Sequence, residues 1–492
     1  MIEQHISLLI VAIPLVLAPV VAVLPNGKLP WLATTVIAWA VFMLAWQQLE
    51  MVSGGTSISY ELGGWPPPWG IEYKIDTTNA LVSLIVAGIA AITMIYASKS
   101  VTREIQESKI SLFYAAFLLC FTGLLGIAQT GDIFNLFVFL EISSLSSYAL
   151  ISMGKKRQAL TAAYQYLIMG TIGATFFLIG VGLLYAMTGT LNMADLAVRL
   201  PDLLGHGTVN TAFAFIMVGF ALKLALFPLH LWLPNAYTYA PSVVTIFLAA
   251  TATKVAVYVM LRVIFTIFGF SEIAATPADE IFLVLCVGGI LIMSFYAIYQ
   301  TDSKRLLAYS SVAQIGYMML GVGLGSMLGL TATLVHLFNH ALMKGALFMA
   351  IGAIVYQIGS SQIKDFAGLG KRMPWTFGAI IIGGLSLIGV PGTAGFVSKW
   401  YLVLAAIEAQ SWLLVIVVLV GSLLAVAYVW KLVEVLYFQD GEAGTTEVKE
   451  APLLLLIPTW ALVVANVYFG INTDLTVGTA ETAVKLLLGG GS

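Results

Sequence analysis

Stretches long and apolar enough to cross a lipid bilayer recur from one end of the chain to the other. The hydrocarbon core of a bilayer is about 30 Å thick, so a helix that crosses it needs about 20 mostly apolar residues. Fourteen such stretches can be counted, at residues 6–24, 31–48, 79–97, 111–129, 132–153, 160–188, 211–233, 240–268, 280–300, 305–325, 329–357, 375–406, 411–430 and 451–470. Because 60% of the residues are hydrophobic and 9% are charged, we predict an all-α polytopic membrane protein with about 14 transmembrane helices.

The cations outside these stretches predict how the chain is oriented. If the N-terminus lies outside the cell, inside loops hold 14 of the lysines and arginines and outside regions hold four, including Arg262 near a helix end. An excess of Lys and Arg on the cytoplasmic side is the usual pattern. We therefore expect a multi-pass protein of a prokaryotic cell (inner) membrane with both termini outside. The formal net charge of −2 and the lack of a basic cluster with interleaved aromatics argue against nucleic-acid binding.

Four lysines remain, and all four lie inside the predicted spans. They are Lys223, Lys254, Lys344 and Lys399, and Glu141 is the carboxylate placed at similar depth. A lysine at mid-bilayer costs about 2.5 to 3.5 kcal/mol on insertion scales, so residues of this kind are usually functional. Burial in general favours the neutral forms of amines and carboxyl groups, and neighbouring charges couple their titration. These five residues therefore predict a proton relay.

Two of the predicted spans contain residues that interrupt a helix. The span 211–233 carries Pro228 and His230, and the span 375–406 carries Pro391 among glycines. Proline removes a backbone donor, and opened backbone at membrane depth is tolerated only against protein or water. Paired broken helices therefore indicate an ion pathway near the midplane, with a packing kink as the alternative for either break alone.

The interrupted spans are about 170 residues apart, which predicts two five-helix repeats. In this division residues 1–110 form an N-terminal three-helix segment with its loops, and 111–268 form the first repeat. The second repeat covers 280–430, and 431–492 hold a cytoplasmic loop, helix fourteen and the C-terminus.

Three polar residues share one face of a predicted span. His336, His340 and Lys344 are four residues apart, so they follow one side of a helix. Two histidines at this spacing could bind a metal, but no further ligand clusters with them and no His-Glu-x-x-His pattern is present. A water-lined proton path is therefore favoured over a metal site. Cys120 and Cys286 lack Cys-x-x-Cys spacing and are expected to be small buried hydrophobic residues.

Several long segments carry a family resemblance. They are 130–141, TGDIFNLFVFLE; 227–242, FPLHLWLPNAYTYAPS; and 302–316, DSKRLLAYSSVAQIG. The histidine and lysine pattern at 336–344 and the sequence GFVSK at 395–399 extend the match over most of the chain. These segments strongly resemble the antiporter-like family shared by Mrp cation/proton antiporters, complex I and membrane-bound hydrogenases.

The resemblance implies fourteen core helices with two inverted five-helix repeats, in which helices seven and twelve are broken. Glu141 on helix five would pair with Lys223 on helix seven, and Lys254 on helix eight would be the central connector. The remaining implied positions are His340 and Lys344 on helix eleven, His336 in support, Lys399 as the terminal lysine on helix twelve, Pro228 and Pro391 at the helix breaks, and His230 at a gating turn.

The resemblance supports two versions of the function, and the residues alone allow a third. The favoured one is a subunit of a multisubunit monovalent cation (Na⁺)/proton antiporter, a secondary transporter and not an enzyme, which moves protons through the relay. The alternative is a proton-pumping subunit of complex I or a membrane-bound hydrogenase, driven by redox chemistry in partner chains. The third is a structural membrane subunit whose lysines only stabilise packing. Other membrane subunits, the lipid bilayer, protons and monovalent cations are the expected partners.

Within the family, the 492-residue length and the helix-five segment are most similar to the D-type subunits of Mrp antiporters (MrpD). Lys399 departs from those relatives that place a glutamate at this position. No segment is typical of nicotinamide, flavin, quinone or iron–sulfur binding, so no cofactor and no redox step are predicted for this polypeptide.

Overall fold

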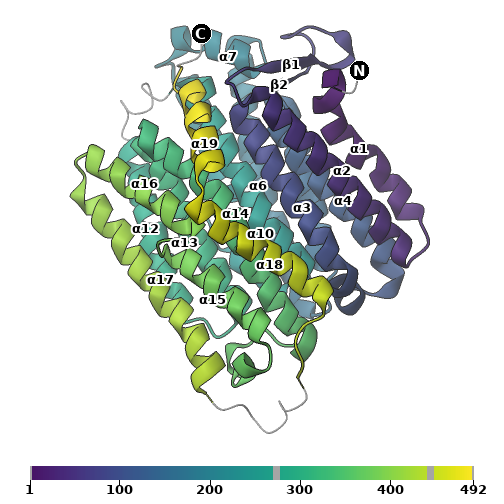
Figure 1. Cartoon of the computed structure of the whole chain (residues 1–492). Helices are drawn as coiled ribbons and strands as arrows, with labels where there is room; N and C mark the ends of the chain where they lie inside the picture. The colour runs from purple at the N-terminus through teal and green to yellow at the C-terminus, as the bar shows by residue number, and fades with distance from the viewer. Residues whose placement is uncertain (1–2, 270–277, 440–447, 490–492) are drawn as a thin grey trace.

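The computed structural model describes residues 3–269, 278–439 and 448–489. Nearly all of this chain is helical, and the long helices run side by side between two faces (Figure 1). The long helices are α1 (Ile6–Val23), α2 (Lys28–Val52), α3 (Thr77–Glu104), α4 (Ile110–Gln129), α5 (Ile133–Ser152), α6 (Arg157–Thr188), α8 (Gly207–Leu224), α10 (Ser242–Leu261), α12 (Ala278–Ile298), α13 (Ser303–Leu324), α14 (Met327–Ile358), α15 (Pro374–Ile388), α16 (Ala394–Glu408), α17 (Trp412–Phe438) and α18 (Leu453–Ile471). Shorter elements are α7 (Met193–Arg199), α9 (Trp232–Tyr239), α19 (Asp474–Leu487), the π-helix η5 (Arg262–Phe268) and the strands β1 (Ile58–Glu61) and β2 (Glu72–Ile75).

The predicted number of membrane crossings is confirmed. Within the described residues, 13 helices are long and apolar enough to cross a membrane. The remaining predicted span, 375–406, consists of α15 and α16, each 15 residues long, which meet at a break. The span 211–233 is broken in the same manner into α8 and the 8-residue α9. Helices seven and twelve of the predicted fold are therefore these two broken pairs.

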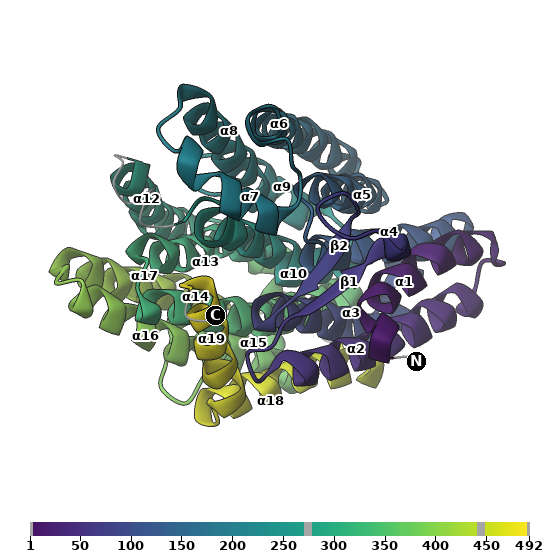
Figure 2. The same ribbon diagram turned by 90° about the horizontal axis from the view of Figure 1, so that it is seen from above.

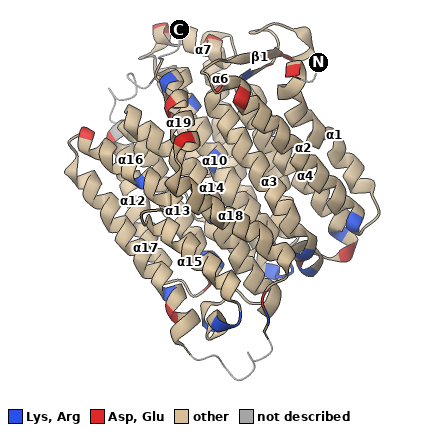
Figure 3. Ribbon diagram, in the orientation of Figure 1, with Lys and Arg blue, Asp and Glu red and all other residues tan. Residues whose placement is uncertain are grey.

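The two faces of the bundle differ in what they carry. Both ends of the described chain lie at one face, together with β1, β2, α7 and α19 (Figure 1); we call it the terminal face. An even number of crossings returns the chain to the face where it began. Figure 3 shows that lysines and arginines gather at the opposite face, below α15 and α17 and at the lower ends of the first helices.

Backbone contacts reveal the internal repeat. The amide of Ile133 donates to the Leu191 carbonyl, and the amide of Met193 donates to that of Gly131. The same exchange recurs 170 residues later, where Ser303 donates to Ser361 and Ile363 donates to Thr301. Helices α6 and α14, which are both 32 residues long, begin 170 residues apart. Because α5 starts at the terminal face and α13 starts at the opposite face, the two five-helix repeats are inverted.

Aspartates fix where several of these helices begin. The Asp132 carboxylate accepts from the Asn135 amide at 2.6 Å, and the Asp302 carboxylate accepts from the Arg305 amide at 3.1 Å. An N-cap of this kind satisfies a backbone donor that a helix start leaves free. The repeat is thus visible in the capping residues as well as in the helix lengths.

Two features of the terminal face were not predicted. Strands β1 and β2 pair antiparallel with Ile58 opposite Ile75, and the segment between them contains three consecutive prolines, Pro66 to Pro68. Helix α19 is amphipathic and buries Val477, Ala480 and Val484, which are spaced three and four residues apart. Neither element contains an apolar run of membrane-spanning length, so the criterion that found the spans could not detect them.

The central helices are α10 and α14. They lie in the middle of the bundle when it is viewed from the terminal face (Figure 2). Helix α10 packs against α8 on one side and α14 on the other, and α14 also packs against α16. This order of contacts places the helices that carry the predicted relay next to one another.

Candidate functional site

The break between α8 and α9 positions Lys223. Helix α8 ends at Leu224, and Ala225 then adopts a left-handed conformation with φ of 60°. Pro228, in the turn that follows, has no amide hydrogen to continue a helix. The indole nitrogen of Trp232 donates to the Leu222 carbonyl at 2.9 Å and so satisfies one acceptor freed at the end of α8. Lys223 lies in this last helical turn.

Lys223 lies beside one face of α5. Its ammonium nitrogen is 3.9 Å from a carboxylate oxygen of Glu141 and donates to the hydroxyls of Ser144 at 2.7 Å and Tyr148 at 3.4 Å. The three partners are spaced three and four residues apart, so they share a face of α5. The structure thus brings the predicted Glu141 and Lys223 together. The Glu141 side chain is 26% exposed at the surface of the bundle, against 7% for Lys223.

A small cavity lies between Lys223 and the central helix α10. It has a volume of about 40 Å³, and Ser143, Ser144, Ser147, Tyr166 and Lys223 give it a polar side. Its other side is apolar and belongs largely to α10, at Ala252, Val255 and Ala256. A polar cavity of this size has room for water.

Lys254 and Lys344 are fully buried on the two central helices. The Lys254 ammonium donates to the Ala249 carbonyl at 2.5 Å and lies 3.3 Å from the Thr253 hydroxyl. The Lys344 ammonium donates to the Leu307 carbonyl at 2.8 Å and to the Ser310 hydroxyl at 2.5 Å. In the described chain neither ammonium has a carboxylate within 4.0 Å. Each lysine is held by neutral oxygen atoms.

His336 and His340 extend the path along α14. Their rings stack with centroids 5.7 Å apart. A ring nitrogen of His336, Nδ1, lies 2.7 Å from the Ser398 hydroxyl, which connects α14 to α16. The other nitrogen of His336 and both nitrogens of His340 are buried and have no hydrogen-bond partner among the described residues. Because those residues bring no group of three or more His, Cys, Asp or Glu together, two imidazoles alone fall short of a zinc site.

The second helix break holds Lys399. Helix α15 ends at Ile388, and Gly389 takes a left-handed conformation with φ of 93° before Pro391. The Lys399 ammonium donates to the carbonyls of Leu387 at 3.0 Å and Ile388 at 2.9 Å. Its third contact is the Ser422 hydroxyl at 3.0 Å. Free carbonyls at a helix C-terminus carry partial negative charge, so this break stabilises a cation.

His230 lies in the turn between α8 and α9. It is buried, with its ring centroid 5.7 Å from that of Phe227 and 6.4 Å from that of Tyr309. Its Nδ1 atom is buried without a hydrogen-bond partner among the described residues. The expected gating turn therefore contains a buried imidazole beside α13, whereas Pro228 and Pro391 both lie at the helix breaks.

The structure corrects the assignment of one loop cation. Lys304 is among the 14 cations predicted for the inside loops, but it is 4% exposed and donates to the Ala240 carbonyl at 3.2 Å and the Ser242 hydroxyl at 3.1 Å. It begins α13, so a count of loop charges could not separate it from solvent-exposed neighbours. Arg262, counted with the outside regions, pairs with Asp76 at 2.6 Å, and its side chain is 11% exposed. No local pattern in the sequence pairs it with Asp76, which lies 186 positions away.

Comparisons with known proteins agree with this geometry. A family model described as NADH:quinone oxidoreductase/Mrp antiporter, TM, matches residues 130–425. The chain is 43% identical to the N subunit of the NADH-quinone oxidoreductase of Desulforudis audaxviator over 96% of both chains. It is 32% identical to the D subunit of the Na⁺/H⁺ antiporter of Alkalihalophilus pseudofirmus, over 84% of this chain and 83% of that relative. Among solved structures, a chain of the Mrp complex from Dietzia sp. superposes with a TM-score of 0.90 at 26% identity, covering 100% of this chain and 98% of that one.

Proposed function

The chain belongs to the NADH:quinone oxidoreductase/Mrp antiporter family, and from this premise we propose that it is a subunit of a multisubunit monovalent cation (Na⁺)/proton antiporter. It is a transporter subunit and not an enzyme. The similarity to the D subunit of a Na⁺/H⁺ antiporter and the superposition on a chain of an Mrp complex support this function. Other membrane subunits are its partners.

The proton path is the ordered series Glu141, Lys223, Lys254, Lys344 and Lys399, with His340 continuing it and His336 in support. The observation that carries this proposal is the set of partners around the lysines. Of the four lysines in the series, Lys223 has a carboxylate within 4.0 Å among the described residues, and the other three donate to carbonyls and hydroxyls. Charging one lysine therefore makes charging its neighbour less favourable, and such coupled sites can pass a proton along the series.

The proposal divides the chain into two repeats and two flanking parts. The repeats occupy 111–268 and 280–430, and each places a lysine ammonium at the end of its first half-helix. The flanking parts are the N-terminal three-helix segment 1–110 and the C-terminal part 431–492.

The terminal face is the outside of a prokaryotic cell (inner) membrane, because the loop cations gather at the opposite face.

A second candidate is a proton-pumping subunit of complex I or a membrane-bound hydrogenase. The 43% identity to the N subunit of an NADH-quinone oxidoreductase favours it. The two candidates differ in their partner chains. Purification of the intact complex from its native membrane separates them, since flavin or iron–sulfur absorption in the complex would support the second candidate and exclude the first.

The relay itself is tested with the intact complex reconstituted in liposomes that contain a pH-sensitive dye. We expect Lys223→Ala and Glu141→Ala each to remove most cation-driven proton movement. The Glu141 carboxylate stabilises the charged form of Lys223, so the loss of either residue changes the charge at the start of the relay. Lys156→Ala, which alters an exposed loop cation, is the matched control and should keep wild-type exchange. Unchanged exchange in both site variants of a normally assembled complex would leave only the structural role for these residues.

A further inference from the structure

A second polar stripe runs along the central helix α10 and ends at the terminal face. Lys254, Tyr258 and Arg262 are four residues apart, so they follow one side of the helix over a rise of about 12 Å. Lys254 belongs to the proposed relay, whereas Tyr258 and Arg262 have no role in it. The stripe leads from the middle of the membrane to the first turn of η5, where the α-helical geometry changes to a π-helix.

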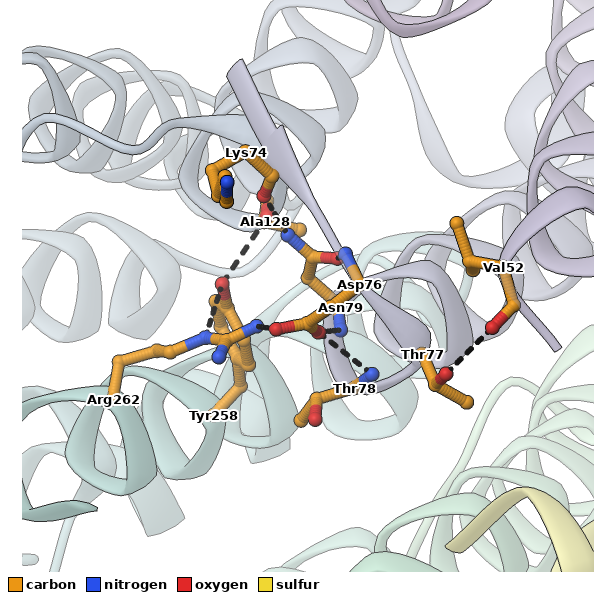
Figure 4. Close-up of polar contacts among 9 residues, drawn as sticks. All are labelled: Val52, Lys74, Asp76, Thr77, Thr78, Asn79, Ala128, Tyr258 and Arg262. Carbon is orange, nitrogen blue, oxygen red and sulfur yellow. Dashed lines mark hydrogen bonds and ion pairs between the residues drawn. The ribbon is translucent and has the colours of Figure 1, made fainter. Parts of the chain in front are cut away.

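The outer end of the stripe is a closed polar cluster (Figure 4). The Arg262 guanidinium contacts the Asp76 carboxylate at 2.6 Å through one nitrogen and donates to the Tyr258 hydroxyl at 3.1 Å through Nε. The Tyr258 hydroxyl in turn donates to the Ala128 carbonyl at 3.3 Å, at the end of α4. The Arg262 and Asp76 side chains are only 11% and 15% exposed. The cluster therefore joins the ends of α3, α4 and α10 across the terminal face.

Asp76 is held rigidly from its own side. Its second carboxylate oxygen accepts from the amides of Thr78 at 2.9 Å and Asn79 at 3.2 Å, as the N-cap of α3. The Asn79 side chain donates to the Lys74 carbonyl at 2.6 Å and so anchors the same turn to β2. An arginine side chain held by a fixed carboxylate and a fixed hydroxyl has little freedom to move.

The relay lysine on this helix faces away from the cluster. The Lys254 ammonium contacts the Ala249 carbonyl and the Thr253 hydroxyl, both of which lie toward the opposite face. Between Lys254 and the terminal face, the next charged group along the stripe is a guanidinium that stays protonated at all ordinary pH values. A guanidinium that is ion-paired with Asp76 and cannot move closes the polar side of α10 at this point to water, protons and cations.

From these contacts we infer that Asp76, Arg262 and Tyr258 form an electrostatic seal, which closes the relay at Lys254 against the terminal face. The inference rests on the proposed function. Asp76 and Tyr258 are positioning residues that hold the guanidinium across the end of the path. Protons then leave the relay only by a route that transport controls, so they cannot return passively along α10.

The test measures passive proton leak in liposomes that contain the intact complex, with a potassium diffusion potential and no exchangeable cation gradient. Asp76→Asn is the decisive variant, because asparagine caps a helix as well as aspartate does and only the charge that holds Arg262 is lost. We expect a several-fold rise in leak for Asp76→Asn and for Arg262→Gln, and a rate near wild type for Arg262→Lys. Asp195→Asn is the matched control, since it breaks the exposed ion pair of Asp195 with Arg199 on the same face and should not change the leak.

A double variant shows whether the leak passes through the relay. Adding Lys254→Ala to Asp76→Asn should return the leak to the wild-type rate. If Asp76→Asn does not assemble, Tyr258→Phe keeps the ring, removes the hydroxyl and should raise the leak as well. A wild-type leak in the assembled variants, or a raised leak that survives Lys254→Ala, would overturn the seal. The relay is judged separately, by loss of exchange in Lys223→Ala, so the failure of one proposal can be told from that of the other.

Discussion

The partners of the buried lysines determine what these residues can do. Among the described residues, the ammonium groups of Lys254, Lys344 and Lys399 donate hydrogen bonds to carbonyl and hydroxyl oxygens and to no carboxylate. The Lys399 ammonium also lies 4.8 Å from the centroid of the Tyr317 ring. A carbonyl accepts a hydrogen bond from a neutral amine as well as from an ammonium. A carboxylate partner, in contrast, would favour the charged state strongly. Sites built from neutral oxygens therefore leave a lysine free to gain and lose its proton, as a relay requires.

Lys399 provides a test at the scale of one hydrogen bond. Ser422→Ala removes one of the three acceptors around its ammonium, a contact worth about 0.5 to 1.5 kcal/mol net. We expect exchange to fall about two- to tenfold in reconstituted complex, while Lys399→Ala should remove most of it. Thr211→Ala is the control, because Thr211 is exposed on α8 and its hydroxyl donates only to the Gly207 carbonyl of its own helix. Equal rates in Ser422→Ala and wild type would show that this acceptor does not support the function of Lys399.

At the scale of the helices, the two breaks provide the charge environment for the lysines. Lys223 lies in the last turn of α8, and Lys399 reaches back to the last carbonyls of α15. An ammonium therefore lies at the C-terminal end of the first half-helix in both repeats. The sequence order differs, because Lys223 precedes its proline and Lys399 follows its own. The ammonium of Lys399 contacts the free carbonyls of a helix end, whereas that of Lys223 contacts residues of α5.

The break before Lys399 allows a paired glycine experiment. Gly389 and Gly392 both have left-handed conformations, with φ of 93° and 87°, so alanine at either should cost about 1 kcal/mol in stability. A Cβ atom at Gly389 would lie 2.9 Å from Cδ of Lys399, whereas one at Gly392 would meet nothing within 4 Å. We expect Gly389→Ala to reduce exchange strongly and Gly392→Ala to reduce it little. Thermal unfolding of the purified complex supplies the stability comparison, and similar exchange in both variants would refute the clash with Lys399.

Features that depend on nearby residues could be predicted from the sequence, whereas contacts between distant residues could not. The helix breaks follow from Pro228 and Pro391, because proline acts locally on the backbone. The spans follow from apolar length in the same way. The pair of Asp76 with Arg262 joins residues 186 positions apart, and the buried site of Lys304 depends on the Ala240 carbonyl, 64 positions away. Contacts of this kind arise from tertiary packing, and no local pattern encodes them.

At the scale of the whole molecule, the inverted repeats place equivalent backbone contacts at opposite faces of the bundle. The first repeat begins at the opposite face and the second begins at the terminal face, so equivalent helices run in opposite directions. Each repeat nevertheless brings its broken helix to the middle of the bundle, beside α10 or α14. The residues of the proposed relay therefore lie on neighbouring helices across the bundle.

The orientation of these faces in the membrane decides the direction of transport, and cysteine labelling tests it. Thr56 lies between α2 and β1 on the terminal face, and Ser108 lies between α3 and α4 on the opposite face; both are exposed. The native Cys120 and Cys286 are buried, so they should give little background. We expect a membrane-impermeant maleimide to label Thr56→Cys in intact cells and to label Ser108→Cys only after permeabilisation, since the cation-rich face should be cytoplasmic. The reverse pattern would invert the proposed topology and would place the seal at Arg262 on the cytoplasmic side.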